Sequence, residues 1–436
     1  MGGRSLAVVL AAGKGTRMRS KTPKVMHEIG GWPMVRHVLA AVAQSGVEDS
    51  ALVVAVESDW AYSMSHGAAV FVQDPPQGTA HAVLAARAAM IAAHDVVVVL
   101  FGDTPLVLPE TISSMVERVR AGADVAVLAF EPEDPTGYGR LLTDDGKLVA
   151  IREERDASPD EKAVGLSNSG IMALSARAVE ALGDINNDNA KGEFYLTDIV
   201  SIGAARGYEM VVEMANREEV MGVNDRAQLA AAEEIFQARK RAQAMEHATL
   251  LAPHTVIFSH DTALKEDVVV EPYVVFGPKV WVGPAARIRA FCHLEDVYVG
   301  EGAVVGPYAR LRPGTWVEEN ARIGNFVEIK NASVGEGAKV NHLAYVGDAR
   351  VGAGANLGAG TITCNYDGIN KFRTTIEAGA FVGSNSALVA PVTIGARAYV
   401  GSGSVVTEDV PADALAIGRG RQVNKPGRSP AAKPKG

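Results

Sequence analysis

Two glycines and two cations follow the first apolar run of the chain. Residues 6–10 lead directly into Gly13 and Gly15, and Arg17 and Lys24 come soon after. Glycines at the end of a buried strand let backbone N–H groups approach a phosphate closely, and nearby cations neutralise its charge. This segment therefore predicts a site for a nucleoside triphosphate. A tight strand-to-helix turn with solvated surface charges is the alternative.

The glycine spacing excludes two common phosphate-binding motifs. Met18 stands where the dinucleotide fingerprint needs its third glycine, and the segment does not read GxxxxGK followed by Ser or Thr. A second apolar run, residues 96–100, is followed closely by Asp103. The carboxyl ends of parallel strands border the ligand crevice of open α/β sheets, and Mg²⁺ prefers one or two carboxylates together with substrate phosphates. We therefore expect Asp103 to bind Mg²⁺, although a structural role is the alternative.

A second set of reactive side chains lies in the C-terminal half. Arg312 and Lys330 are 330 − 312 = 18 residues apart. In a repeat with coils of about 18 residues they would stack one strand spacing apart, about 4.8 Å. Two cations so close repel unless an anion lies between them, which predicts a bound phosphate. Histidine is the side chain best suited to accept a proton near neutral pH, so His342 is a candidate general base. Solvated cations and a structural histidine are the alternatives.

Apolar runs and helical patterns alternate over the first 224 residues. Strands that are apolar on both faces and separated by helices form a parallel sheet covered on both sides. This part is therefore predicted to be a Rossmann-like α/β domain. The expected strands are residues 6–10, 51–56 and 96–100, and the expected helices are residues 33–44 and 78–93.

A six-residue repeat dominates the chain after this domain. Aliphatic or aromatic residues recur every six positions, as in Val299, Val305, Leu311, Val317 and Ile323, and glycine often follows them. A period of six keeps these residues on one face of a strand, whereas a helix would carry them around its axis. Hexapeptide periodicity is the signature of a parallel β-helix. The register fails around residues 363–373, which predicts a loop on the binding face.

A helix and a basic tail flank this repeat. Residues 225–248 read as one helix between two unlike compositions, and Asn224 or Asp225 can cap its start. We expect this helix to link two domains. Residues 421–436 contain Lys and Arg, no acidic residue and few apolar ones, which predicts a disordered tail.

The composition limits the class of protein. The chain has 436 residues, with 42 Lys and Arg against 51 Asp and Glu, so its net charge of −9 argues against non-specific nucleic-acid binding. Its two cysteines cannot build a disulfide scaffold or a cysteine zinc site. No apolar run is long enough for a membrane span, and the N-terminus lacks a signal-peptide pattern. We expect a cytoplasmic enzyme of small molecules, with neither nucleic acid nor membrane as partner.

The motifs around the first site resemble those of the sugar-phosphate nucleotidyltransferases. With the hexapeptide repeat attached, residues 1–420 are similar to the bifunctional N-acetylglucosamine-1-phosphate uridyltransferase / glucosamine-1-phosphate acetyltransferase family. Phe101 stands where many relatives have Tyr, but the following Gly-Asp pair is intact. The motifs are Leu10-Ala-Ala-Gly13-x-Gly15-Thr-Arg17-Met18, Pro23-Lys24, Gln73, Gly78-Thr79, Phe101-Gly-Asp103 and Gly137-Tyr-Gly139-Arg140.

The resemblance implies roles for residues of the first domain in binding UTP, the sugar phosphate and Mg²⁺. Asp103 and Asn224 would bind Mg²⁺, and Arg17 and Lys24 would hold phosphates. The uridine would contact Leu10, Ala11, Ala12, Gly13, Gln73, Gly78 and Thr79, and N-acetylglucosamine would contact Gly139, Glu153 and Asn168, with Tyr195 and Thr197 as further candidates.

The resemblance also implies roles in the β-helix, where acetyl-CoA would be the acetyl donor. His342, in Asn341-His-Leu-Ala-Tyr345, would be the catalytic base. The sugar phosphate would contact Arg312, Lys330, Tyr345, Asn356 and Lys371, and acetyl-CoA would contact Ala359, Asn365, Tyr366, Ser384, Ser402 and Arg419.

The resemblance further implies an organisation in four parts. These are a uridyltransferase domain (1–224), a linker helix (225–248), a left-handed parallel β-helix acetyltransferase domain (249–420) and the tail (421–436). The expected assembly is a homotrimer with acetyl sites between subunits, making UDP-N-acetylglucosamine for peptidoglycan. Two alternatives stay open: a nucleotidyltransferase with the β-helix as a trimerising scaffold, and a binding or regulatory module with neither activity.

Overall fold

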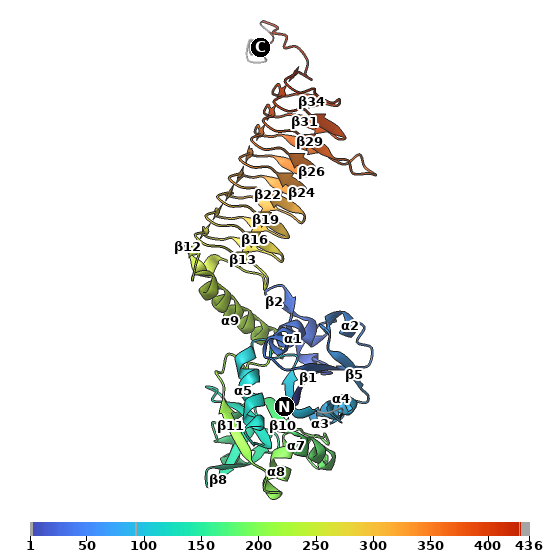
Figure 1. The fold of residues 1–436 in the computed structure, drawn as a ribbon, viewed down its shortest axis with the longest axis vertical. Helices are drawn as coiled ribbons and strands as arrows, with labels where there is room; N and C mark the ends of the chain where they lie inside the picture. The colour runs from blue at the N-terminus through green and yellow to red at the C-terminus, as the bar shows by residue number, and fades with distance from the viewer. Residues whose placement is uncertain (1–2, 92–93, 427, 429–436) are drawn as a thin grey trace, which may run out of the picture. The chain divides into compact units, whose positions relative to one another are not determined.

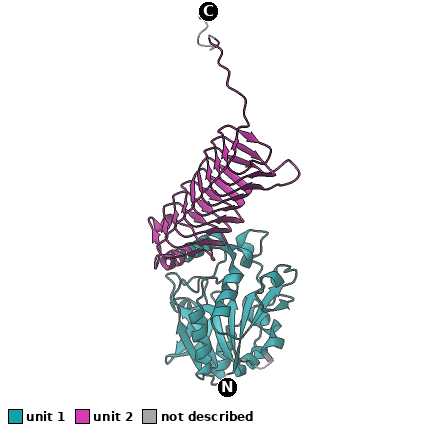
Figure 2. Cartoon of the chain, turned by 45° about the horizontal axis from the view of Figure 1, so that its top comes forward, with its two compact units in different colours: residues 1–236 teal, residues 237–436 magenta. Residues whose placement is uncertain are grey.

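The chain forms two compact units, Met1–Phe236 and Gln237–Gly436, which Figure 2 colours separately. The structure is a computed structural model that describes residues 3–91, 94–426 and 428. The division between the units falls inside helix α9 (Arg226–Ala244), which covers most of residues 225–248. Asp225 caps this helix, because its Oδ1 accepts the backbone N–H of Gln228 at 2.9 Å. The side chain of Asn224 is therefore left for other contacts.

A nine-stranded sheet forms the centre of the first unit, with the main strand order β11-β7-β10-β6-β1-β4-β5. Neighbouring strands along this path are parallel except β10, which runs antiparallel to both β6 and β7. The predicted parallel sheet is thus confirmed for the other strands of this path, whereas β10 and the attached pair β8 and β9 are antiparallel. The strands are β1 (Arg4–Ala11), β4 (Asp49–Ala55), β5 (Ala69–Gln73), β6 (His94–Phe101), β7 (Val125–Phe130), β8 (Arg140–Asp144), β9 (Lys147–Arg152), β10 (Ser167–Ser175) and β11 (Met210–Met214), with a separate hairpin of β2 (Glu28–Ile29) and β3 (Trp32–Pro33).

Helices cover both faces of this sheet, as the apolar strands require. Leu6 and Val8 of β1 pack in one buried cluster, and Ala7 and Val9 pack in another, because successive side chains of a strand point to opposite faces. The expected helix over residues 78–93 is two helices with a break at Ala86, and its residues 92–93 lie outside the described residues. The helices are α1 (Met34–Gln44), α2 (Ala61–Met64), α3 (Thr79–Ala85), α4 (Arg87–Ile91), α5 (Pro109–Arg120), α6 (Pro159–Lys162), α7 (Ala176–Ala181) and α8 (Asp198–Ala205), with short 3₁₀ turns at Thr16–Met18, Lys24–Met26 and Leu182–Asp184. A further 3₁₀ turn, Pro253–Thr255, belongs to the second unit.

The second unit is a parallel β-helix whose short strands stack in three columns (Figure 1). One column is the sheet β12-β14-β17-β20-β23-β25-β27-β30-β33-β35. The long strands β24 and β26 pair with members of both other columns, and so join them. Parallel pairing in hexapeptide coils agrees with the predicted left-handed β-helix.

The strands of the β-helix are short and evenly spaced. The first column holds β12 (Thr249–Leu250), β14 (Val269–Val270), β17 (Arg287–Ile288), β20 (Val304–Val305), β23 (Arg322–Asn325), β25 (Lys339–His342), β27 (Asn356–Leu357), β30 (Phe381–Val382), β33 (Tyr399–Val400) and β35 (Leu415–Ala416). The other columns hold β13 (Ala263–Leu264), β15 (Val275–Phe276), β16 (Val280–Val282), β18 (His293–Leu294), β19 (Val297–Val299), β21 (Arg310–Leu311), β22 (Thr315–Val317), β24 (Glu328–Val334), β26 (Tyr345–Val351), β28 (Ile362–Cys364), β29 (Thr374–Ile376), β31 (Ala387–Val389), β32 (Val392–Ile394) and β34 (Val405–Val406).

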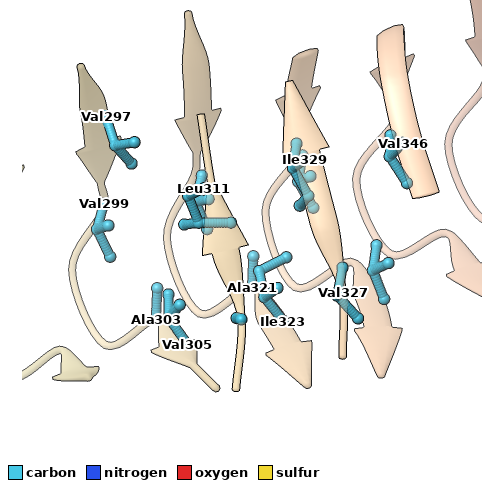
Figure 3. Close-up of a cluster of buried hydrophobic side chains, with 14 of the residues drawn as sticks. Val297, Val299, Ala303, Val305, Leu311, Ala321, Ile323, Val327, Ile329 and Val346 are labelled. Carbon is cyan, nitrogen blue, oxygen red and sulfur yellow. The ribbon is translucent and has the colours of Figure 1, made fainter. Parts of the chain in front are cut away.

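The six-residue repeat fills the interior of the β-helix. Val299, Val305, Leu311 and Ile323 are at most 1% exposed, and their side chains point inward coil after coil (Figure 3). Burial of each aliphatic side chain contributes about 1.5–3 kcal/mol, so the stack of coils is stabilised mainly by this column of contacts. Coils lie so close at some corners that a Cβ on Gly324 would stand 1.8 Å from the carbonyl oxygen of Asn341.

The C-terminal tail contributes no regular secondary structure in its described part. Residues 421–426 form neither helix nor strand, and most of the rest of the tail predicted to be disordered lies outside the described residues. Among the residues that the structure describes, no helix is both long and apolar enough to cross a membrane.

Candidate functional sites

A cavity of about 510 Å³ opens at the carboxyl ends of β1 and β6. The two strand ends are held together because the N–H of Gly102 donates to the carbonyl of Leu10 at 2.8 Å. Gly15 keeps a left-handed backbone (φ 59°) where a Cβ would stand 2.5 Å from the Cβ of Lys24. The predicted residues that line this cavity are Leu10, Ala11, Ala12, Gly13, Lys24, Gln73, Gly78, Thr79 and Asp103.

Two cations and two oxygen ligands meet beside this cavity. The Lys24 ammonium pairs with Oδ2 of Asp103 and lies 3.3 Å from Oδ1 of Asn224. Arg17 donates to the same Asn224 oxygen at 2.8 Å. The side chains of Lys24 and Asp103 are only 13% and 17% exposed, so their charges interact with little screening by water. Four residues taken from distant points of the sequence thus form one cluster.

A second cavity of about 220 Å³ shares Thr79 and Phe101 with the first. Gly139, Glu153, Asn168 and Thr197 line it, as expected for the sugar side. Thr197 donates its hydroxyl to Oε1 of Glu153 at 3.2 Å, and the N–H of Asn168 donates to the carbonyl of Gly139 at 2.8 Å. Burial raises the pKa of the Glu153 carboxyl, because the ionised form is poorly solvated there.

Tyr195 is placed differently from the other sugar-side candidates. It does not line either cavity, and its buried hydroxyl has no hydrogen-bond partner in the described structure. Burial, with Asp156 and Glu153 nearby, raises the pKa of this phenol to about 12. Lys14 and Glu193 also line the larger cavity, although neither was predicted from the sequence to be a site residue. Lys14 stands between the two loop glycines, a position that could have identified it, whereas nothing in the sequence marks Glu193.

His342 lies at the end of β25, in a cavity of about 350 Å³. Its Nδ1 is 2.8 Å from Oδ1 of Asn325, one coil earlier. An amide oxygen can only accept, so Nδ1 donates the proton and Nε2 keeps a lone pair. Arg289 and Arg322 line the same cavity. Neither Asn325 nor these arginines were singled out in the sequence.

Three cations cluster on the β-helix, as the 18-residue spacing predicts for the first two. Leu311 pairs with Ile329 across the sheet, which stacks Arg312 beside Lys330. The nearby ammonium of Lys371, and then Arg312, lower the pKa of Lys330 because like charges disfavour its protonated form. Glu328 pairs with Arg312 at 2.8 Å, and Asp348 is the one further carboxylate that acts on Lys330 and Lys371 among the described residues, so three cations face two carboxylates. The cluster therefore favours an added anion.

Four predicted residues occupy equivalent positions in successive coils. The carbonyl of His342 accepts the N–H of Gly360, that of Ala359 accepts from Asn385 at 2.7 Å, and that of Ser384 accepts from Gly403 at 2.7 Å. Arg419 then donates to the carbonyl of Ser402 at 2.5 Å. This column, defined as His342, Ala359, Ser384, Ser402 and Arg419, runs over about 14 Å from the histidine to Ser402 at one strand spacing per coil.

The other predicted residues of the β-helix lie on two different columns of strands. Asn356 lies on β27 and pairs with Lys339 and Phe381. Tyr345 lies on β26 and pairs with Glu328 of β24. The loop of residues 365–373, which leaves the β-helix between β28 and β29 (Figure 1), carries Asn365, Tyr366 and Lys371. Asn365 donates to Asp348 at 2.5 Å, and Tyr366 pairs with Lys371 within the loop.

The two cysteines form no disulfide, and the described residues contain no preformed metal cage. Cys292 and Cys364 are free thiols, and burial raises the pKa of Cys292 to about 11. Among residues 3–91, 94–426 and 428, no three His, Cys, Asp or Glu side chains are grouped to hold a metal ion. An ion at Asp103 and Asn224 would therefore depend on ligand oxygens from a substrate.

The chain is similar to known proteins over both units. Residues 7–182 match the family model of the MobA-like NTP transferase domain, and residues 296–331 and 373–408 match the bacterial transferase hexapeptide (six repeats). The bifunctional protein GlmU of Xanthobacter autotrophicus is 57% identical over 99% of each chain. That of Azorhizobium caulinodans is 57% identical over 97% of this chain and 96% of its own, and that of Agrobacterium fabrum is 53% identical over 98% and 95%. The chain belongs to the family of bifunctional GlmU proteins.

Proposed function

We propose that this chain makes UDP-N-acetylglucosamine through two successive transfers, one in each unit. Unit 2 transfers acetyl from acetyl-CoA to glucosamine 1-phosphate, and unit 1 joins the N-acetylglucosamine 1-phosphate to the uridylyl group of UTP. The observation that carries the proposal is that each unit has its own cation cluster and its own candidate reactive group. Lys24 contacts Asp103 in unit 1, and unit 2 holds both the cluster around Lys330 and the imidazole of His342. The partners are small molecules, and the setting is the cytoplasm.

The uridylyl transfer uses the two connected cavities of unit 1. The triphosphate lies over Gly13 in the larger cavity, and the sugar phosphate lies beside Glu153 in the smaller one. A phosphate oxygen of the sugar phosphate attacks the α-phosphorus of UTP in line, the bond from that phosphorus to the bridging oxygen breaks, and pyrophosphate leaves. Arg17 and Lys24 hold the phosphates and neutralise their charge, since such a step needs positioning and electrostatic stabilisation more than covalent help.

The cluster at the strand ends also fits Mg²⁺. Oxygen atoms of Asp103 and Asn224 both contact one cation, the ammonium of Lys24, so the two oxygens are already arranged around a positive charge. One carboxylate and one amide oxygen, completed by substrate phosphates, are a donor set that Mg²⁺ accepts. When bound there, Mg²⁺ would neutralise charge on the nucleotide phosphates. Lys24, beside Asp103, would then be available to contact a phosphate oxygen of the nucleotide.

The acetyl transfer uses the lone pair on Nε2 of His342. This nitrogen takes a proton from the amine of glucosamine 1-phosphate while the amine attacks the thioester carbonyl. A C–N bond forms, the C–S bond breaks, and CoA leaves as the thiol after it receives a proton. Arg312, Lys330 and Lys371 hold the sugar phosphate, and Asn325 keeps the imidazole in the tautomer that can accept a proton.

The column from His342 to Arg419 supports one placement for acetyl-CoA. The pantetheine arm follows the small residues Ala359, Ser384 and Ser402, which leave room along the column, and its acetyl end reaches His342. The guanidinium at the end of the column suits a phosphate of the cofactor.

A homotrimer completes the acetyl site. Tyr273, Phe291, Tyr308, Phe326 and Leu343 form an exposed apolar column, at least 46% exposed each. The four rings stack with centroids 5.0, 4.8 and 5.2 Å apart. An apolar stripe of this kind marks a protein interface. Because Leu343 follows His342 directly, a neighbouring subunit on this column adds a wall to the site.

An assay of both activities on one purified chain tests the proposal. We expect thiol release from acetyl-CoA with glucosamine 1-phosphate, and pyrophosphate release from UTP with N-acetylglucosamine 1-phosphate. Pyrophosphate release alone would support a nucleotidyltransferase whose β-helix is only a scaffold. The absence of both activities would contradict the proposal entirely.

A further inference from the structure

A buried ion pair is formed by the chain neighbours of two residues that line the smaller cavity of unit 1. Nη2 of Arg140 is 2.8 Å from Oε2 of Glu154, and the side chains are 2% and 28% exposed. A buried guanidinium is unfavourable unless it is paired and hydrogen-bonded, so its presence at the edge of a sheet calls for an explanation. The residues that precede these two in sequence, Gly139 and Glu153, line the cavity.

The ion pair connects the two segments that carry these cavity residues. Arg140 opens β8, Arg152 ends β9, and the two residues are paired across the ladder. Gly139 and Glu153 line the cavity, whereas Arg140 and Glu154 do not, so each residue of the ion pair is the chain neighbour of a cavity residue. A Cβ placed on Gly139 would stand 3.6 Å from Oε1 of Glu153, which shows how close the two cavity residues lie.

Arg140 also holds the peptide before Gly139. Its Nη1 donates to the carbonyl of Tyr138, a residue that lines the cavity. The ring of Tyr138 packs edge-on against Phe130 with centroids 5.0 Å apart. The carbonyl of Gly139 in turn accepts the N–H of Asn168. One guanidinium therefore ties the segment that carries Tyr138 and Gly139 to the segment that carries Glu153 and Glu154.

We propose that the Arg140–Glu154 ion pair is a positioning element that fixes Gly139 and Glu153 at the separation the sugar phosphate needs. This inference rests on the proposed uridylyl transfer. It states that the ion pair determines the KM of that reaction for the sugar phosphate. Neither residue touches the substrate. The pair acts through its chain neighbours, so it affects the sugar side of the site and leaves the triphosphate side unchanged.

Glu154→Gln is the first test, because it keeps the size and the acceptor oxygen and removes the charge. We expect the KM for N-acetylglucosamine 1-phosphate to rise about tenfold, as loss of a charge-assisted hydrogen bond implies, while the KM for UTP stays within about twofold. Glu213→Gln is the matched control: it removes a 2.6 Å ion pair with Arg118 in the same unit, away from both cavities. The control should keep both KM values.

A double variant covers the case in which an unpaired buried charge prevents folding. Arg140→Met with Glu154→Met removes both charges, so no charge remains buried without a partner. We expect the same selective rise in the KM for the sugar phosphate. A wild-type KM in the double variant, a Glu154→Gln variant that matches Glu213→Gln, or an equal rise in the KM for UTP would overturn the positioning role.

Measurements on the wild-type protein separate this inference from the proposed function. Calorimetric titration of wild-type protein with N-acetylglucosamine 1-phosphate, beside the pyrophosphate assay, gives the reference. Wild-type protein that neither binds the sugar phosphate nor releases pyrophosphate defeats both. Wild-type turnover with no selective effect of Glu154→Gln defeats the positioning role alone.

Discussion

Asn325 offers a sharp test of how the β-helix performs acetyl transfer. Its amide oxygen accepts the Nδ1 proton of His342 at 2.8 Å and so keeps Nε2 free to accept the proton of the substrate amine. Asn325→Ala removes this acceptor and leaves the histidine in place. The imidazole then populates both tautomers and turns more freely, so only part of the protein is ready to react.

The size of the effect follows from the exposure of the pair. His342 is exposed, so water replaces part of the lost contact, and a neutral hydrogen bond of this kind contributes about 0.5–1.5 kcal/mol. At about 1.36 kcal/mol for each tenfold change in rate, kcat for acetyl transfer should fall about threefold to tenfold. His342→Ala removes the base itself and should lower kcat by about 10² to 10⁴.

Thiol release from acetyl-CoA measures the effect, and a double variant reveals its origin. Asn325→Ala should reduce the rate in the wild-type background and have no further effect when His342 is already Ala. Pyrophosphate release by unit 1 serves as the internal control and should stay unchanged. An Asn325→Ala variant at wild-type rate, or one that slows the His342→Ala protein further, would refute the tautomer argument.

Three further predictions concern charge and assembly. Lys371 lowers the pKa of Lys330, and binding of inorganic phosphate should raise that pKa again. Calorimetry at pH 9 in two buffers should therefore detect proton uptake, and phosphate should bind more weakly than at pH 7. The same binding heat in both buffers after correction for buffer ionisation would contradict this prediction. The hydrogen bonds that the Ser5 hydroxyl and N–H donate to Glu48 lower its pKa to about 2, so its stabilising effect is complete above pH 4.5 and is lost as the pH falls toward 2. Since that carboxyl is 41% exposed, Glu48→Gln should cost only about 1 kcal/mol of unfolding free energy at pH 7 and remove this acid-range slope, as urea denaturation at several pH values would reveal. Phe326→Asp should convert trimers to smaller species in a sedimentation experiment. Acetyl transfer should fall at least about tenfold, while pyrophosphate release persists. A variant that remains a trimer would argue against this interface.

The sequence was most informative where one local pattern decides the structure. The run before Gly13 predicts a strand end and a glycine loop, and the structure has both. The hexapeptide period predicts buried positions such as Val305 and Ile323, because only a β-helix keeps them on one side. The same spacing predicts that Arg312 and Lys330 stack.

Residues that depend on long-range placement were harder to predict. Asn325 contacts His342 across 17 residues, one fewer than the 18-residue spacing, so the partner cannot be identified without the exact register of each coil. The break at Ala86 has no Gly or Pro to announce it in an alanine-rich segment. The antiparallel direction of β10 follows from its pairing with β6 and β7, which its apolar pattern does not encode.

The central claim is that two independent reaction centres share one chain, and a crossed pair of variants tests it most directly. His342→Ala and Asp103→Ala are each assayed for thiol release and for pyrophosphate release. We predict that His342→Ala loses acetyl transfer and keeps uridylyl transfer, and that Asp103→Ala shows the reverse. Loss of both activities in either folded variant would contradict the claim.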